Sequence, residues 1–228
     1  LGARKIATTE AAVVFEPEAA ASLLRSVAAA VDGRAVYRGA SFLAGRLGER
    51  VASPLVTVVD DGRLPGGLGS RPFDAEGTPT SRTVVIEEGI LCAYLLDSYS
   101  ARKLGLAPTG HASRGPGEPP HPAPTNFLLW PGPDAPPPEA ILRSTPRGLY
   151  VTELSGFGVN LATGDYSRGA FGFWIEGGEL AYPVAEVTIA GNLGRMLLDI
   201  DAVGRDLALR SAVAAPTLRV ARMTIAGR

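Results

Sequence analysis

The sequence predicts an α+β fold that is mainly antiparallel β-sheet, barrel-like or sandwiched, with a few short helices. Two observations carry this prediction. The last third of the chain is a series of β-rich runs separated by Gly-containing turns, and the first third holds one strongly helical segment. With 228 residues, of which 46% are hydrophobic, the chain is long enough to bury one large core. We therefore expect residues 1–228 to form a single domain.

The first third predicts a strand followed by a helix. Ala11–Phe15 is a short apolar run, and Pro17 suits the first position of a helix. Leu23, Leu24 and Val27 recur at helical spacing and are expected to form the core face of this helix. Its predicted end is at Asp32-Gly33, after which residues 34–50 are expected to be helical or irregular.

A hairpin and a short helix are predicted near the middle of the chain. Arg82–Glu87 and Ile90–Asp97 are β-rich, and Glu88-Gly89 between them is a typical hairpin turn. Ser98 is the expected N-cap of a helix over Tyr99–Leu104. The other predicted strands are Leu55–Asp60, Asn126–Trp130, Leu149–Leu154, Val159–Leu161, Ala170–Glu176, Glu179–Ile189 and Thr217–Ile225. Two more helical stretches are expected, Glu139–Arg143 and a segment capped by Asn192, Leu193–Ile200.

Composition argues against several classes of function. The 22 basic residues are matched by 23 acidic ones, so we expect no direct binding of nucleic acid. Cys92 is the one cysteine, which excludes a disulfide framework, and its apolar neighbours predict a buried, inert thiol. No apolar run is long enough to cross a bilayer and no signal peptide opens the chain, so a cytoplasmic location is expected.

Local motifs for catalysis or metal binding are weak. The two histidines, His111 and His121, are ten residues apart in a Pro/Gly-rich segment, so they lack the helical-turn spacing of a hydrolytic zinc site. The adjacent carboxylates Asp60 and Asp61 would point to opposite faces of a strand. No catalytic residue and no metal ligand is therefore predicted in this chain.

The long loop 107–124 is the best candidate for a functional segment. Loops of this length inside a domain are usually functional or mobile, and this one is surrounded by cations, hydroxyls and an amide that suit a peptide backbone or a carboxylate. The predicted peptide-binding residues are Arg102, Thr109, His111, Arg114, Thr125 and Asn126. The alternative is an ordinary exposed loop with capping hydroxyls.

Several motifs resemble those of the TldD/PmbA family, which is known for peptide maturation and a proposed modulation of DNA gyrase. They include YLLDSYSARKLGLAPTGHASR, PTNFLLWPG, GLYVTELSGFGVNLATGDYSRGAFGFWIEGGE, YPVAEVTIAGNL and PTLRVARMTIAG. The resemblance runs from about Leu91 to the C-terminus, with a looser match over Val13–Leu24. It implies the C-terminal domain of a longer chain whose N-terminal half is absent here.

The resemblance also implies which branch of the family this is. In TldD-like members, a HExxxH helix and a distant cysteine hold zinc, and the enzyme cleaves unfolded peptides. Here Phe15 and Ala20 occupy the two histidine positions, only Glu16 remains, and the cysteine region, residues 202–210, has no Cys. The chain therefore resembles the PmbA-like (TldE) branch, which lacks the zinc ligands.

By this resemblance we expect a metal-free subunit that forms a dimer with a TldD-like zinc peptidase and acts on unfolded peptides. The zinc would lie in the partner, and microcin precursors are among the family's substrates. Two alternatives remain open. One is a peptidase that recruits metal through His111 and His121, and the other is a homodimeric peptide-binding or scaffold protein.

Overall fold

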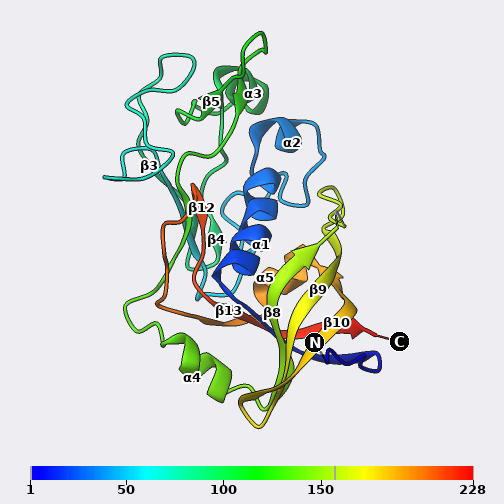
Figure 1. The fold of residues 1–228 in the computed structure, drawn as a ribbon. Helices are drawn as coiled ribbons and strands as arrows, with labels where there is room; N and C mark the ends of the chain where they lie inside the picture. Colours follow the sequence, from blue (N-terminus) through cyan, green and yellow to red (C-terminus); the bar gives the residue numbers. More distant parts are fainter. Residues whose placement is uncertain (1, 157, 228) are drawn as a thin grey trace.

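Two β-sheets on either side of one long helix make up the fold (Figure 1). The computed structural model describes residues 2–156 and 158–227. It confirms the predicted α+β class, with the β-structure mainly antiparallel. The helix between the sheets is α1, Pro17–Ala30, which contacts strands of both.

The first sheet closes into a barrel. Its strands are β1 (Thr9–Phe15), β8 (Arg147–Ser155), β9 (Asp165–Glu176), β10 (Glu179–Asn192) and β13 (Leu218–Ala226). Closure occurs because β1 pairs in parallel with β8 and antiparallel with β13, so no barrel strand lacks a neighbour on either side. The short strand β11 (Ile200–Val203) extends the sheet by pairing with the first part of β13.

The second sheet carries the loops that surround the candidate site. Its strands, in spatial order, are β12 (Val213–Ala214), β7 (Phe127–Trp130), β2 (Thr57–Asp61), β3 (Arg82–Glu87) and β4 (Ile90–Leu91). The predicted Glu88-Gly89 turn is confirmed, since both residues have positive φ, 45° and 83°. A separate two-stranded ribbon, β5 (Ala112–Ser113) with β6 (His121–Pro122), lies within the predicted long loop.

Helix α1 forms where the sequence predicts it and is buried except along one side, which carries Arg25. Pro17 stands at its first turn, and Leu23, Leu24 and Val27 belong to one core cluster with residues of both sheets. Alanines at most other positions let the two sheets approach the helix closely. A helix packed on two sides fixes the position of the barrel relative to the second sheet.

Four shorter helices cap the two sheets: α2 (Gly33–Tyr37), α3 (Ser98–Leu104), α4 (Pro138–Arg143) and α5 (Leu193–Leu198). The N-cap of α3 is Asp97 and not Ser98, because the Asp97 carboxylate accepts from the backbone N–H of Ser100 in a capping box. The predicted helix Leu193–Ile200 is two residues too long, since Ile200 already begins β11.

Three further expectations need correction. Val159–Leu161 forms no strand and makes only one bridge, between Val159 and Tyr166. The strand predicted over Ile90–Asp97 ends at Leu91. Cys92 is exposed and not buried, because Leu91 points into the core and the next residue faces outward.

Among the helices that the structure describes, none is both long and apolar enough to span a membrane.

Candidate functional site

The six predicted peptide-binding residues separate into a buried group and an exposed pair. The side chains of His111 and Thr125 meet at Asp60, a residue for which the sequence predicted no role, and Thr109 joins them through His111. Asn126 lies beside this group, whereas Arg102 and Arg114 are exposed. We call Asp60, Thr109, His111 and Thr125 the Asp60 network.

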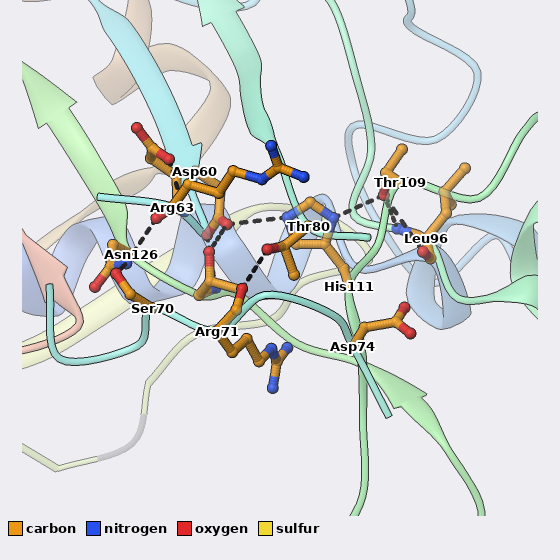
Figure 2. Close-up of polar contacts among 12 residues, drawn as sticks. Asp60, Arg63, Ser70, Arg71, Asp74, Thr80, Leu96, Thr109, His111 and Asn126 are labelled. Atoms are coloured by element: carbon orange, nitrogen blue, oxygen red, sulfur yellow. Dashed lines mark hydrogen bonds and ion pairs between the residues drawn. The ribbon is translucent and has the colours of Figure 1, made fainter. Parts of the chain in front are cut away.

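The Asp60 network is centred on a carboxylate with no exposed surface (Figure 2). Its Oδ1 lies 3.0 Å from Nε2 of His111 and also accepts a hydrogen bond from the hydroxyl of Thr125. Its Oδ2 accepts from the backbone N–H of Thr125 at 2.8 Å. Three donors therefore satisfy one buried carboxylate, which is the arrangement that lets a charge remain inside a protein.

Through Thr109, His111 connects this network to the segment before α3. Its Nδ1 lies 2.8 Å from the hydroxyl of Thr109, and that hydroxyl accepts the backbone N–H of Leu96 at 2.7 Å. Because the Asp60 carboxylate can only accept, Nε2 carries the proton in this arrangement. Both ring nitrogens of His111 are thus occupied, and 2% of the residue is exposed.

Asn126, which precedes β7, holds the loop of residues 62–80 next to the end of β2. Its Oδ1 accepts from the backbone N–H of Gly69 at 2.9 Å, and its Nδ2 donates to the carbonyl of Asp61 at 2.6 Å and to the hydroxyl of Ser70 at 2.9 Å (Figure 2). One amide therefore fixes the end of β2 and the Gly-rich loop that follows it.

Asp74 joins loop 62–80 to the β5–β6 ribbon. Its Oδ1 accepts the backbone N–H groups of Glu76 and Thr78, both at 2.9 Å, and its Oδ2 accepts that of Ala112 at 3.0 Å. Asp74 and the Asp60 network thus bind the ribbon at neighbouring positions, Ala112 and His111. The loops at this end of the molecule are held by buried acceptors.

The Asp60, His111 and Thr109 side chains are linked in the order of an acid–base–nucleophile triad. The hydroxyl of Thr109 is nevertheless engaged with the backbone of Leu96, accepting its N–H and lying 3.3 Å from its carbonyl. The imidazole and carboxylate are both closed off from solvent. A substrate carbonyl cannot reach the base, so the arrangement acts as a structural brace.

The two exposed arginines lie at the same end of the molecule, where α3 and β5 are adjacent (Figure 1). Arg102 is on α3, and its Nε donates to the carbonyl of Ser98 at 3.3 Å. Arg114 follows β5 directly, and its guanidinium makes no hydrogen bond or ion pair with the residues that the structure describes. Both cations are available to a ligand at this end of the molecule, and we call the surface that carries Arg102 and Arg114 the rim.

A second candidate region lies at the start of α1, where the resemblance places the zinc motif. A cleft of about 260 Å³ is lined there by Glu16, Glu18, Asp206 and Arg210, among others. Burial, followed by the charge of Glu18, raises the pKa of Glu16 above its ordinary value, and Arg210 opposes this effect. Asp206 is already held by Thr217, whose hydroxyl donates to it at 2.8 Å.

These residues do not fit a zinc ion. Phe15 and Ala20, at the two histidine positions, are fully buried apolar side chains in the core. Zinc sites in proteins are built mainly on His and Cys, with carboxylates as additional ligands, and neither His nor Cys is among the described residues that line this cleft, where a guanidinium lies next to the carboxylates. Within residues 2–156 and 158–227, no group of three or more His, Cys, Asp or Glu side chains could hold a metal.

Comparison with known proteins identifies the family. The family model described as "PmbA/TldA metallopeptidase C-terminal domain" matches residues 8–227. The metalloprotease PmbA of Escherichia coli O157:H7 is 42% identical over 235 residues, which cover 100% of this chain and 48% of that protein. The chain therefore spans about half the length of the curated relatives that it matches.

Solved structures agree with the sequence comparison. A proposed modulator of DNA gyrase from Thermotoga maritima has a TM-score of 0.91 at 34% identity, covering 99% of this chain and 52% of that one. TldE from Thermococcus kodakarensis has a TM-score of 0.89 at 27% identity, with coverage of 99% and 52%. From these matches and the geometry above, the chain belongs to the PmbA/TldD family, in its PmbA-like branch, and corresponds to the family's C-terminal domain.

Proposed function

We propose that this chain is the metal-free partner subunit of a TldD-type zinc peptidase that acts on unfolded peptides in the cytoplasm. The observation that carries the proposal is the start of α1. Buried apolar side chains, Phe15 and Ala20, stand where TldD-like members have zinc-binding histidines, and the described residues contain no other group that could hold a metal. The zinc and the chemical step then belong to the partner.

The exposed rim gives such a subunit a way to contribute to catalysis. Arg102 and Arg114 would contact the peptide, while Thr109, His111, Thr125 and Asn126 hold the loops that carry this rim. Because these loops are already ordered, the rim binds substrate without a further loss of loop conformational entropy. Trimming of peptide precursors, including microcins, is the kind of process in which the complex would act.

The outer face of the barrel supports association with a partner. Phe171 and Phe173 point the same way on β9 and are 39% and 37% exposed. Leu180 on β10 is 44% exposed and extends the same strip. Trp174, the residue after Phe173, points to the opposite face of β9 and is core, with 4% exposed. Exposed apolar strips of this kind usually mark interfaces.

Reconstitution tests the proposal. This chain, a TldD-type subunit that carries HExxxH, and their mixture are each analysed by light scattering, elemental analysis and cleavage of an unfolded peptide. We expect a mixed dimer with zinc bound by the TldD-type subunit, and cleavage that requires both chains. The proposal fails if this chain alone cleaves the peptide or carries stoichiometric zinc, or if the two chains do not associate.

The same light-scattering measurement distinguishes the mixed dimer from the alternative of a homodimeric scaffold protein. Phe173→Asp should abolish association, because it puts a charge in the middle of the exposed strip. If the unmixed chain forms a dimer that Phe173→Asp disrupts, and the mixed dimer never appears, the scaffold alternative replaces the proposal.

A further inference from the structure

A second cleft opens on the exposed side of α1, between this helix and the beginning of β9. Its volume is about 320 Å³. Its polar lining comes from Ser22, Arg25 and Ser26 on the helix and from Arg168 on the strand. The described lining residues include no aspartate or glutamate, so they give the cleft two positive charges and two hydroxyls.

Arg168 is held in this cleft with part of its hydrogen-bonding capacity unused. Its Nη1 donates to the hydroxyl of Ser22 at 2.7 Å, and its Nη2 lies 3.4 Å from the carbonyl of Leu154. Its Nε is buried and has no partner among the described residues. A buried donor on a charged group is costly when it is unsatisfied, so this guanidinium is built to receive another acceptor.

Tyr166 provides a second unsatisfied donor on the same strand face. It is two residues before Arg168, with no bulge between them, and its hydroxyl is also buried without a partner among the described residues. Burial raises the pKa of Tyr166 to about 12, although Arg168 opposes this effect, so the hydroxyl keeps its proton at neutral pH. Tyr166 belongs to the core and does not line the cleft, so the case for an anionic ligand rests on Arg168 and the other polar residues of the lining.

Arg25 adds the charge that faces solvent. It is one helical turn after Ser22, so both side chains lie on the same side of α1. It is exposed and forms no hydrogen bond or ion pair with any residue that the structure describes. Guanidinium groups present paired N–H donors that match the two oxygens of a carboxylate.

We propose that this cleft binds a carboxylate of a peptide, either its C-terminal group or an acidic side chain. Arg168 and Arg25 pair with the two oxygens, and the hydroxyl of Ser26 supplies a further donor. Apolar walls formed by Ala29, Val159 and Leu161 accept the carbon atoms next to that group. The choice of a peptide rests on the function proposed above, whereas the choice of an anion rests on the cleft itself.

The test measures binding by this chain alone, so it does not depend on the activity of a complex. The probe is a fluorescein-labelled Gly/Ala pentapeptide that ends in leucine, compared with its C-terminal amide by fluorescence anisotropy. We expect the acid to bind at least about tenfold more tightly than the amide, since charge-assisted hydrogen bonds are lost in the amide. Acetate at high concentration should compete with the acid.

The variants are Arg25→Ala, Arg168→Met and, as a matched control on α4, Arg143→Ala. Arg25 is exposed, so its variant should keep the melting temperature while weakening the acid about tenfold and leaving the amide unchanged. Equal binding of acid and amide, or unchanged affinity in both cleft variants, overturns the proposal. Stronger competition by inorganic phosphate than by acetate would assign the cleft to a phosphate instead.

The two proposals can fail separately. If this chain does not associate with a zinc-bearing subunit, the partner function fails while the ratio of acid to amide affinity still stands. If that ratio is one but the mixed dimer cleaves peptides, the carboxylate site fails while the partner function stands.

Discussion

Nε2 of His111 lies 3.0 Å from Oδ1 of Asp60, and 2% and 0% of the two side chains are exposed. The two residues are separated by 51 positions in the sequence and connect the β5–β6 ribbon to the end of β2. This contact makes the stability of the candidate rim depend on a buried polar pair.

His111→Ala should therefore lower the free energy of unfolding by about 2–4 kcal/mol, because it removes one of three donors from a buried carboxylate. Urea denaturation measures the loss. Asp60→Asn and the double variant complete a cycle, and we expect a coupling energy well above 0.5 kcal/mol, as for residues in contact. Additive effects of the two substitutions would show that the pair is not coupled.

Arg114→Ala should change stability by less than about 0.5 kcal/mol, since the side chain is exposed and makes no hydrogen bond or ion pair with the described residues. In the reconstituted complex it should raise KM for an unfolded peptide and leave kcat unchanged, because the interaction is made equally in the ground and transition states. Steady-state kinetics beside a thermal melt checks both parts. An unchanged KM would remove Arg114 from the proposed rim.

Gly69→Ala should destabilise loop 62–80 by about 1–3 kcal/mol, because the added methyl group would overlap the carbonyl of Thr125. Gly132→Ala is the matched control. Gly132 has no positive φ and open space around it, so its variant should be as stable as the parent or slightly more stable. Chemical denaturation of both variants measures the difference, and equal losses would contradict the close approach at Gly69.

The Glu16 carboxyl should titrate above its ordinary value of 4.5, which NMR can follow directly. Arg210→Ala should raise this pKa further, since Arg210 favours the charged form. Below the ordinary value Glu16 is protonated in both folded and unfolded chains. As pH rises from there to the raised pKa, the folded chain holds more protons than the unfolded chain, so the free energy of unfolding falls over that window. Above the raised pKa, the contribution of Glu16 to the free energy of unfolding no longer changes with pH. Glu16→Gln should remove this slope.

Much of the fold followed from local patterns. Helix α1 was predictable because its proline, alanines and apolar spacing lie within one segment, and the Glu88-Gly89 turn is specified by its own two residues. Closure of the barrel was not predictable, because β1 finds its partners 136 or more positions away, starting with Ala12 opposite Gly148, and one of the two pairings is parallel.

The candidate site shows the same limit. The sequence selected Thr109, His111, Thr125 and Asn126 from their position around a Gly/Pro-rich loop, and the structure brings them close together. It could not show that His111, Thr125 and Asn126 are buried, since the acceptor shared by His111 and Thr125 is Asp60, which precedes Thr125 by 65 positions. A pairing over that distance leaves almost no local signal in the sequence. The one local hint is that Asp60 lies near the end of β2, next to polar loops.

Pairing of β1 with β13 has a consequence for biosynthesis. Thr9 lies opposite Ile225, so the barrel is a structure of high contact order. While a ribosome is still making this chain, the apolar residues Val13, Val14 and Phe15 have no β13 partner until Leu218–Ala226 has emerged. Strand β8 can pair with one edge of β1 once it has emerged, but the other edge stays open until β13 follows, which makes β1 the segment that a chaperone would be expected to protect.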